Sequence, residues 1–423
     1  MVKEGYKETE MGLIPKLWSV NSLHEHLLLL TDYDANGSFA DMANNVKTTW
    51  GNGFAWFVRA TDLEQKSEMS EVKYTDKTSY EFLKKSALFG KELLVAKRGE
   101  IGKVYYFQMK TQYATLGPNL YLLKLKETLN SNFLYWFFLS EIGQEKLKEI
   151  NASTSLGAIY KDDVKKLKVP IPPLCEQQKI AESLSDMDNL ISSLEKLIEK
   201  KKVIKQGAMQ ELLTGKKRLP GFCGKIEYKP LKVLCEIFAD GDWIESKDQS
   251  SDGIRLIQTG NIGVGKYLDK DDKQRFISED TFKKLNCLEI FENDVLVSRL
   301  PEPAGRACIL PSSSKRRITA VDCTIIRFTN YNPVLFVAYS QTKEYRNNVD
   351  MAMAGSTRQR ISRKELGEIP IPVFPSKEEQ DAIASILSDM DEEITALEQK
   401  LAKCQKLKQG MMQQLLTGKI RLV

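Results

Sequence analysis

A long segment occurs twice in this chain, and this repeat limits the possible folds more than any other feature. Residues 176–219 read EQQKIAESLSDMDNLISSLEKLIEKKKVIKQGAMQELLTGKKRL, and residues 379–422 read EQDAIASILSDMDEEITALEQKLAKCQKLKQGMMQQLLTGKIRL. The copies lie a constant 203 residues apart (379 minus 176), align without a gap and agree at more than half of their positions. This period is far too long for a solenoid and describes two similar half-molecules. Two similar halves suggest a target that also has two parts.

The composition is that of an ordinary soluble protein. A length of 423 residues leaves room for roughly two to four domains, and 42% hydrophobic with 28% charged residues is typical of a globular fold. The net charge of +5 only weakly favours a polyanionic partner. Seven scattered cysteines without a C-x-x-C pair favour reduced thiols over disulfides or a zinc site. The polar N-terminus and a longest apolar run of only Phe133–Leu139 predict a cytoplasmic protein without a signal peptide or membrane span.

Both copies of the repeat have the pattern of a long helix. Apolar residues recur in steps of four and three, which keeps one narrow stripe facing a partner helix, as in a coiled coil. The alternative is that each stripe docks on its own globular domain. We expect the two helices to pair, in antiparallel orientation because a globular domain separates them, with Lys205 and Lys408 weakening or bending the pair or marking a solvated stretch. The pairing residues are Ile180, Leu184, Met187, Ile191, Leu194 and Ile198 in the first copy and Ile383, Leu387, Met390, Ile394, Leu397 and Leu401 in the second.

Residues typical of helix ends flank both copies. Ser376 and Glu379 have the spacing of a capping box, and the first copy follows Pro172-Pro173, where proline suits a first helical turn. Both copies end in Leu-Leu-Thr-Gly, so Gly215 and Gly418 are expected to adopt the left-handed conformation that ends a helix.

The segments between the helices differ in sequence but share a skeleton. Phe89–Val95 corresponds to Phe291–Val297, and Arg59–Leu63 corresponds to Gln258–Ile262. Short β-rich runs alternate with Gly, Asn and Asp turns, and helical stretches follow near 132–150 and 333–349. A common scaffold with different surfaces is what two readers of two different half-targets would need.

These patterns predict an α+β fold in which two mixed α/β globules are separated by two long helices that pair as an antiparallel coiled coil. The piece 12–18 resembles 215–222, which indicates a circular, pseudo-twofold arrangement whose start lies near its end. The expected domains are an N-terminal segment (1–17), a first globule (18–170), a central helix (171–216), a linker (217–227), a second globule (228–372) and a C-terminal helix (373–423).

At this level of detail the chain resembles a specificity subunit of a type I restriction–modification system, over nearly its whole length. The resemblance rests on the order of globules and helices and on three kinds of string: Pro170–Gln178 (PIPPLCEQQ), the Ser-Asp-Met-Asp pair at 185–188 and 388–391, and the two Leu-Leu-Thr-Gly-Lys endings. It implies a non-catalytic subunit that binds a bipartite, asymmetric double-stranded DNA sequence, one half per recognition domain. It also implies that the helices hold two methyltransferase subunits and that restriction subunits join the complex.

Motifs for catalysis are missing from the sequence. Asn332–Leu335 lacks the second proline and the aromatic residue of an amino-methyltransferase loop, and Gly263-x-Gly265 lacks the third glycine of a nucleotide-binding loop. His24 and His26 are the only histidines and have no cysteine nearby, so a metal site is not expected. The sequence therefore predicts no catalytic residues, no cofactor and no metal.

Basic, amide and aromatic residues occur where DNA contacts would be needed. Arg and Lys suit phosphates and guanine edges, whereas Gln and Asn suit adenine edges. The alternative for each residue alone is a solvated surface side chain, so the corresponding pairs Arg59 with Gln258, Lys97 with Arg299, and Lys103 with Arg306 are favoured. The loops 153–155 and 356–360 form a second candidate set, with a plain connector as the alternative. The DNA-binding candidates are Trp56, Arg59, Thr61, Lys97, Arg98 and Lys103 in the first globule, and Gln258, Asn261, Arg275, Arg299, Arg306, Lys315, Arg316, Arg317, Arg358 and Arg360 in the second.

Two other classes of function fit part of the pattern. A coiled-coil scaffold that tethers proteins without reading DNA explains the helices but not two differently surfaced globules on one skeleton. The specificity chain of a related system, in which one partner polypeptide both methylates and cleaves, cannot be separated from the type I reading by sequence.

Overall fold

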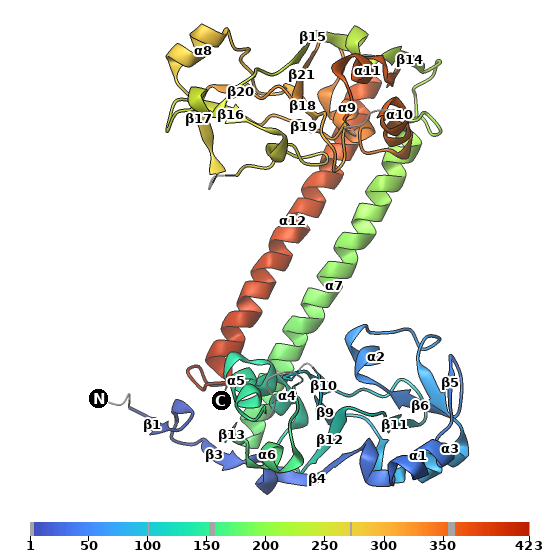
Figure 1. Cartoon of the computed structure of the whole chain (residues 1–423), viewed down its shortest axis with the longest axis vertical. Helices are drawn as coiled ribbons and strands as arrows, with labels where there is room; N and C mark the ends of the chain where they lie inside the picture. Colours follow the sequence, from blue (N-terminus) through green and yellow to red (C-terminus); the bar gives the residue numbers. More distant parts are fainter. Residues whose placement is uncertain (1–3, 100, 152–156, 271–272, 354–359, 423) are drawn as a thin grey trace. The chain divides into compact units, whose positions relative to one another are not determined.

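The computed structural model describes residues 4–99, 101–151, 157–270, 273–353 and 360–422 (Figure 1). The chain divides into two compact units, of which unit 1 comprises residues 1–193 and 401–423 and unit 2 comprises residues 194–400. The repeated segments form the helices α7 (Leu174–Leu212) and α12 (Lys377–Leu415), each 39 residues long. Each unit therefore contains one globule and a part of both long helices.

Unit 1 is built on two sheets whose strands lie between short helices. The first sheet has the order β10-β9-β12-β4, and the second has the order β5-β7-β6-β11-β8, with β6 and β11 parallel. The first sheet consists of β4 (Leu27–Asp32), β9 (Leu93–Ala96), β10 (Val104–Tyr106) and β12 (Leu120–Leu125); the second consists of β5 (Thr48–Trp50), β6 (Ala55–Val58), β7 (Lys73–Thr75), β8 (Ala87–Leu88) and β11 (Ala114–Leu116). The helices are α1 (Phe39–Asn45), α2 (Ala60–Glu64), α3 (Lys77–Phe82), α4 (Ser131–Leu139), α5 (Glu141–Glu149) and α6 (Lys161–Lys166), and the outer strands are β1 (Tyr6–Thr9), β2 (Gly12–Pro15), β3 (Ser19–Ser22) and β13 (Lys168–Ile171).

Unit 2 repeats this plan with different residues. Its first sheet has the order β19-β18-β21-β15, which is the equivalent of β10-β9-β12-β4 in unit 1. Its second sheet has the order β17-β16-β20. As in unit 1, the central strand has one parallel neighbour (β16 with β20) and one antiparallel neighbour (β16 with β17). The shared skeleton predicted from sequence is confirmed. The strands are β14 (Glu227–Pro230), β15 (Cys235–Asp240), β16 (Ile254–Ile257), β17 (Arg275–Ile277), β18 (Val295–Ser298), β19 (Ala307–Ile309), β20 (Arg317–Thr319), β21 (Cys323–Phe328) and β22 (Pro370–Val373), and the helices are α8 (Glu279–Leu285), α9 (Pro333–Tyr339), α10 (Lys343–Met353) and α11 (Arg363–Glu368).

The apolar stripe of each long helix begins in the core of a globule. Ile180 and Leu184 of α7 are buried in the core of unit 1, together with Leu415 near the end of α12. In unit 2 the roles are exchanged, because Ile383 and Leu387 of α12 share a core with Leu212 of α7. Docking on the adjacent globule, the alternative reading of the stripe, therefore holds for the first two stripe positions of each helix. Further along, Ile191, Leu194, Ile198 and Ile394 are also buried, whereas Met187, Met390, Leu397 and Leu401 are half-buried.

Ion pairs connect the two long helices within each unit. In unit 2, Lys201 bonds Glu393 and Lys205 bonds Asp391, so rising residue numbers in α7 meet falling numbers in α12, as in an antiparallel pair. In unit 1, Lys408 bonds Asp188, which is the repeat-equivalent of the Lys205–Asp391 pair. Each of these lysines thus reaches a carboxylate on the opposite helix, and whether it weakens or bends the pair stays a prediction. Coiled-coil packing of the stripe residues and a twofold relation between the halves stay predictions.

Both long helices end in the same left-handed glycine turn, as predicted. Gly215 and Gly418 have φ angles of 70° and 69°, which a residue with a side chain rarely adopts. In each turn a backbone N–H reaches back six residues to a carbonyl, from Lys217 to Glu211 and from Ile420 to Gln414. The Gly215 and Gly418 N–H groups donate to the Leu212 and Leu415 carbonyls at 3.2 Å, which is one of the two hydrogen bonds of a Schellman motif.

Each glycine turn packs against the entry of a globule. A side chain on Gly418 would collide with Pro15 and approach Trp18, and one on Gly215 would collide with Ile226. The Tyr6 hydroxyl also donates to the Gly418 carbonyl at 3.0 Å. Both ends of the chain thus lie in unit 1, as a circular arrangement requires.

A buried glutamate at the start of each long helix binds an arginine that follows the end of the other helix. Glu176 has an exposed fraction of 0% and accepts two hydrogen bonds from Arg421 (2.5 and 2.7 Å) and one from Trp18 Nε1 (3.0 Å). Glu379 binds Arg218 in the same two-pronged way, with both distances 2.6 Å. The capping box is therefore only half formed. The Ser376 hydroxyl caps the Glu379 N–H at 3.1 Å, but the Glu379 carboxylate binds Arg218.

Replacing Arg421 by Met should lower the free energy of unfolding of unit 1 by about 3 kcal/mol, because it leaves the buried Glu176 carboxylate without its cation. Equilibrium urea unfolding followed by tryptophan fluorescence measures this, since the buried Trp18, Trp56 and Trp136 all lie in unit 1. The exposed neighbour Lys419, replaced by Met, is the matched control and should change the value little. Equal effects of the two substitutions would show that the Arg421–Glu176 pair does not stabilise the unit.

Candidate nucleic-acid interface

The corresponding pair Arg59 and Gln258 occupies the same turn in the two units. Each residue directly follows a buried strand, β6 or β16, and precedes a short helix, α2 or the 3-10 helix η6 (Thr259–Asn261). The Arg59 N–H donates to Asp62 Oδ2 (3.2 Å), and the Gln258 N–H donates to Asn261 Oδ1 (3.0 Å). Asn261 is buried and caps this turn, and its role as a DNA contact stays a prediction.

An exposed tryptophan lies beside two cations in unit 1. The side chain of Trp50 is 61% exposed, with the Arg59 guanidinium 4.7 Å and the Lys73 ammonium 5.1 Å from its ring centre. Asp62 also binds the Arg59 side chain, with Nε 3.1 Å from Oδ2, and thereby orients it. Thr61 is exposed one residue before Asp62. We call Trp50, Arg59 and Lys73 the Trp50 cluster. It presents an aromatic face with an excess of positive charge.

Unit 2 has a comparable cluster on β17, the strand equivalent to β7. Phe276 lies opposite Arg255 in the strand pairing, with the Arg255 guanidinium 5.7 Å and the Lys315 ammonium 5.0 Å from the ring centre. Lys315 and the neighbouring Arg275 are exposed, whereas Arg255 is buried. We call Phe276, Arg255 and Lys315 the Phe276 cluster. Sequence reasoning missed Lys73 and Phe276 as members, because their position beside Trp50 and Lys315 depends on how the strands pair.

The basic run 315–317 does not form one phosphate-binding surface. Arg316 is exposed but binds both Glu279 and Glu289 through five hydrogen bonds of 2.7 to 3.1 Å. Its hydrogen bonds with Glu289 and Glu279 raise the pKa of Arg316. Arg317 is buried, and this burial lowers its pKa. Lys315 extends over the Phe276 ring from an exposed position, whereas the exposed Arg316 lies over the Phe282 ring (4.6 Å) and is held there by the two glutamates.

Several other candidates are buried or already bound within their unit, and their role as DNA contacts stays a prediction. Trp56 is buried in a core with its ring centre 5.5 Å from that of Phe107. Lys97 and Arg299 are buried and bind carboxylates. Arg306 donates to five backbone carbonyls, those of Thr259, Ile262, Leu300, Pro301 and Pro303.

The remaining candidates lie nearer the surface. Arg98 is exposed, Lys103 is half-buried and pairs with Glu64 at 2.9 Å, and Arg360 pairs with Asp322 at 3.0 Å. Arg358 and the loops 153–155 and 356–359 lie outside the described residues.

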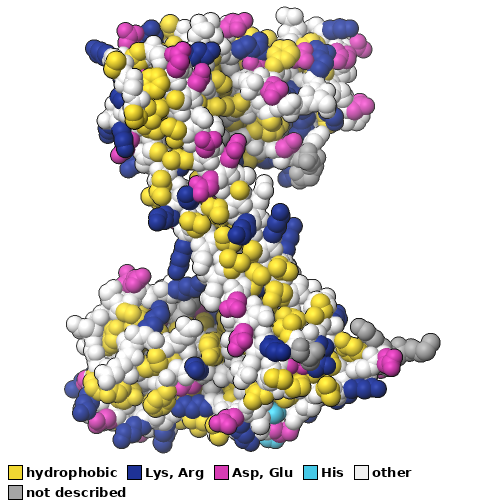
Figure 2. Space-filling model, turned by 180° about the vertical axis from the view of Figure 1, so that it is seen from behind, with side chains coloured by type: hydrophobic (Ala, Val, Ile, Leu, Met, Phe, Trp, Pro, Cys, Tyr) yellow, Lys and Arg dark blue, Asp and Glu magenta, His cyan; other side chains and the backbone are white. Residues whose placement is uncertain are grey.

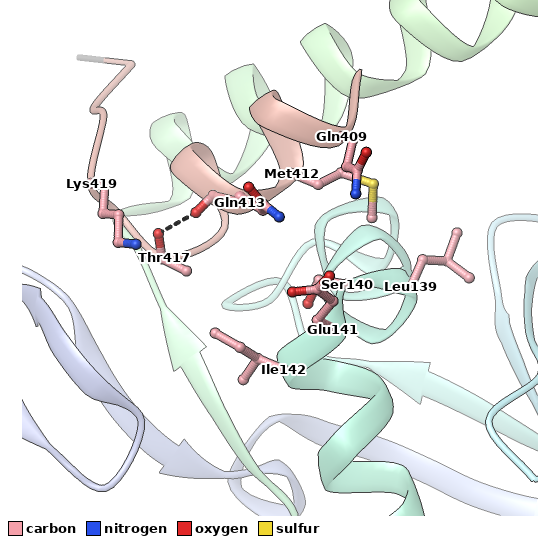
Figure 3. Close-up of a pocket in the computed structure, with 9 residues that line it drawn as sticks. All are labelled: Leu139, Ser140, Glu141, Ile142, Gln409, Met412, Gln413, Thr417 and Lys419. Carbon is pink, nitrogen blue, oxygen red and sulfur yellow. Dashed lines mark hydrogen bonds between the residues drawn. The ribbon is translucent and has the colours of Figure 1, made fainter. Parts of the chain in front are cut away.

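A groove of about 540 Å³ lies in unit 1 between the turn joining α4 to α5 and the last turns of α12 (Figure 3). Leu139 and Glu141 line one side, and Gln409 and Met412 line the other. A groove of about 570 Å³ in unit 2 is lined by the repeat-equivalent residues Gln206, Met209 and Gln341. Two concave surfaces of similar construction thus accompany the two copies of the repeat.

Charged and apolar side chains are mixed on the visible surface. Lys and Arg side chains are scattered over the face seen in Figure 2, with hydrophobic side chains between them.

Within the described ranges, no group of three His, Cys, Asp or Glu side chains could hold a metal ion. The described helices also include none that is both long and apolar enough to span a membrane.

Comparisons with known proteins place this arrangement in a family. The profile of the "Type I restriction modification DNA specificity domain" matches residues 40–206 and again residues 224–407. The chain belongs to this family of type I restriction–modification specificity subunits.

Relatives and solved structures agree with this assignment. A protein of Methanocaldococcus jannaschii, provisionally named the MjaX type I restriction enzyme specificity subunit, is 26% identical over 99% of this chain and 97% of its own length. The MjaVIII specificity subunit of the same organism is 28% identical over 68% of this chain and 70% of its own. The crystal structure of a type I S subunit from M. genitalium has a TM-score of 0.60 at 15% identity, covering 94% of this chain and 96% of that one, and therefore shares its fold.

Lys315 and its neighbour Arg316 should differ in their effect on DNA affinity. Lys315→Met should weaken binding by the same factor for every duplex and reduce the slope of log K against log salt by about 0.9, as expected for one lost phosphate contact. Arg316→Met, which removes a side chain already bound to two glutamates, should change the slope less. Fluorescence anisotropy titrations at several salt concentrations, with partner subunits present, measure both. A larger slope change for Arg316→Met would contradict this assignment.

Proposed function

We propose that this chain is the sequence-specific DNA-binding subunit of a type I restriction–modification complex and reads a bipartite, asymmetric site, with one half for each unit. The observation that supports this most directly is that two units with the same strand order present different side chains at equivalent positions. Arg59 in unit 1 stands where unit 2 has Gln258, and the Trp50 cluster stands where unit 2 has the Phe276 cluster.

The chemistry of these positions suits double-stranded DNA. An arginine favours guanine and a glutamine favours adenine in the major groove, so the exchange at one position would change the base preference. The exposed Trp50 and the half-buried Phe276 suit apolar contacts such as a thymine methyl group, while Lys73 and Lys315 suit phosphates. Tryptophan and arginine are also typical of protein–protein interfaces, but the excess of cations in both clusters favours a polyanionic partner.

We also propose that the chain is non-catalytic, uses no cofactor and holds two methyltransferase subunits, with restriction subunits completing the complex in the cytoplasm. The repeated helices and the two similar grooves support two copies of one partner, because equivalent surfaces recruit equivalent proteins. A chain with the same fold, at TM-score 0.51 and 14% identity, comes from work described as the structural basis of complex assembly of the type I R-M system. All seven cysteines are free thiols, which suits a reducing compartment.

Two other functions explain less of the structure. A pure scaffold would need the helices and grooves but not two different cation–aromatic clusters on one skeleton. A specificity chain for a fused methyltransferase–nuclease partner would use the same DNA-reading units and differs only in the partner.

Exchanging residues 18–170 for the same domain of a relative should change one of the two DNA blocks and leave the other intact, because each unit has its own sheets and core. Methylation mapping of the reconstituted complex measures this. The reciprocal exchange of residues 228–372 is the control and should change the other block. A change in both blocks after either exchange would contradict the proposal that each unit reads one half.

The purified chain alone should neither transfer methyl groups nor bind S-adenosylmethionine, because the nucleotide-binding and amino-methyltransferase motifs are missing from its sequence. Isothermal titration calorimetry and a methyl-transfer assay test this, with the chain mixed with its methyltransferase subunit as the positive control. Saturable binding of S-adenosylmethionine by the chain alone would exclude a purely non-catalytic role.

A further inference from the structure

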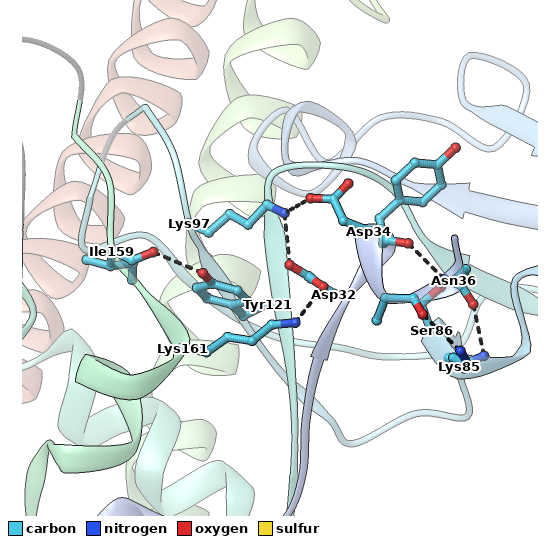
Figure 4. A network of polar contacts seen from close by, with 11 residues as sticks. Asp32, Asp34, Asn36, Lys85, Ser86, Lys97, Tyr121, Ile159 and Lys161 are labelled. Carbon is cyan, nitrogen blue, oxygen red and sulfur yellow. Dashed lines mark hydrogen bonds and ion pairs between the residues drawn. The ribbon is translucent and has the colours of Figure 1, made fainter. Parts of the chain in front are cut away.

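Three charged side chains meet at one end of the first sheet of unit 1 (Figure 4). Asp32 is the last residue of β4, Lys97 directly follows β9, and Lys161 begins α6. Asp32 accepts from Lys97 Nζ at 3.0 Å and from Lys161 Nζ at 2.7 Å, one on each carboxylate oxygen. Asp34 adds a second carboxylate, 2.5 Å from Lys97 Nζ. We call Asp32, Lys97 and Lys161 the Asp32 triad.

Unit 2 has the same arrangement built from different residues. Asp240 is the last residue of β15, Arg299 directly follows β18, and Arg363 begins α11. Arg299 Nε lies 3.3 Å from Asp240 Oδ1, and Arg363 Nε lies 3.9 Å from Asp240 Oδ2. We call these three residues the Asp240 triad. The recurrence of one carboxylate between two cations, on the same three elements, shows that the arrangement belongs to the scaffold and not to one sequence.

Burial makes each triad sensitive to the loss of a member. The side chain of Lys97 is 8% exposed and that of Arg299 is 4% exposed, and both aspartates end buried or half-buried strands. Burial alone would raise the pKa of Asp32, but hydrogen bonds from Lys161 and Lys97 outweigh it and hold that pKa below its ordinary value. The carboxylate is therefore charged, and removing a cation leaves a buried charge uncompensated.

Each triad holds together two loop bases that are far apart in the sequence. The Lys97 carbonyl accepts from the Ile159 N–H at 3.1 Å, and Gly99 N–H donates to Gly157 at 3.0 Å. In unit 2 the Arg299 carbonyl accepts from the Ile361 N–H at 3.2 Å. The exposed Arg98 lies within the joined segment of unit 1, and Arg360 directly precedes Ile361 in unit 2.

The triads also connect these loop bases to the long helices. The third member of each triad lies on α6 or α11, which leads through β13 or β22 directly into α7 or α12. Val164 of α6 and Leu366 of α11 are buried in the core of their unit, so the short helices are fixed in place. A cation on a fixed helix can therefore set the position of the strand end opposite it.

We propose that the Asp32 and Asp240 triads are equivalent positioning devices, each of which sets the position of the joined loop bases of its own unit, beside the DNA-binding candidates Arg98 and Arg360, relative to the long helix that follows. This rests on the proposed DNA-reading function and adds residues that act through others rather than by touching DNA. Because one unit uses Lys97 where the other uses Arg299, the position requires a cation and not a particular side-chain shape.

The test compares substitutions at this position in the complex of the chain with its methyltransferase subunit. Lys97→Met should reduce the discrimination between correct and incorrect bases in one block by about tenfold, comparable to one lost base contact, and leave the other block unchanged. Arg299→Met should do the same for the other block. Lys97→Arg and Arg299→Lys should retain discrimination, because each copies the other unit. Lys165→Met, on α6 with an exposed ion pair to Asp162, is the control and should change neither block.

Binding to a library of sites with single base changes in each block gives these ratios. Unchanged discrimination in Lys97→Met, loss in both blocks together, or equal loss in Lys97→Arg would each overturn the proposal. If Lys97→Met yields too little folded complex, Lys161→Met tests the same triad at a site whose side chain is 35% exposed.

Hydrogen exchange separates failure of this proposal from failure of the proposed function. The amides of Gly99 and Ile159 should exchange faster in Lys97→Met than in Lys97→Arg or Lys165→Met, whether or not DNA is present. If the unaltered complex binds all sites equally, the proposed DNA-reading function is wrong. In that case the amide hydrogen exchange rates alone decide whether the triad orders the loop bases. Equal exchange in all three variants would refute the positioning role.

Discussion

The architecture depends on the two buried glutamates that begin the long helices. Each accepts a two-pronged hydrogen bond from an arginine that follows the end of the other helix, Glu176 from Arg421 and Glu379 from Arg218. A buried carboxylate is tolerated only when it is paired and hydrogen-bonded, so each helix start requires the other helix's end. Segments that are distant in sequence are thereby brought into one core in each unit, and the chain closes on itself.

This mutual dependence explains why the repeated segments resemble each other while the globules do not. Within each unit the helix residues share the core, the glycine turns pack against the globule entry, and Asp188 or Asp391 binds a lysine of the opposite helix. Each of these contacts involves both helices or a helix and a sheet, which limits the residues that fit. The Trp50 and Phe276 clusters lie on the second sheets, outside these contacts, and can differ without disturbing them.

Charged residues divide into two kinds in this protein. Arg306, Arg317 and the two triads use their charge inside a unit, to fix turns and strand ends in place. Arg59, Lys73 and Lys315 place a cation beside an aromatic ring at or near the surface. The first kind supports the second, because a base contact is specific only when the loop that bears it is held in a defined position.

The sequence by itself determined the repeat, the long helices with their glycine ends, and a shared skeleton of the two globules at several matched strings. These features follow from local rules, namely apolar periodicity, the left-handed conformation of glycine and the alignment of two copies within one chain. Sequence also found the position shared by Arg59 and Gln258, because the strings Arg59–Leu63 and Gln258–Ile262 correspond within the two globules.

Only the tertiary structure decided which cations face outward. Lys97, Arg299 and Arg317 are as polar as Arg59 and Lys315, but their carboxylate partners or covering strands come from positions remote in the chain. The lysines 205 and 408 likewise looked unfavourable on an apolar stripe until the opposite helix supplied Asp391 and Asp188. Burial and ion pairing depend on which segments meet in space, and a sequence pattern records only the character of each segment alone.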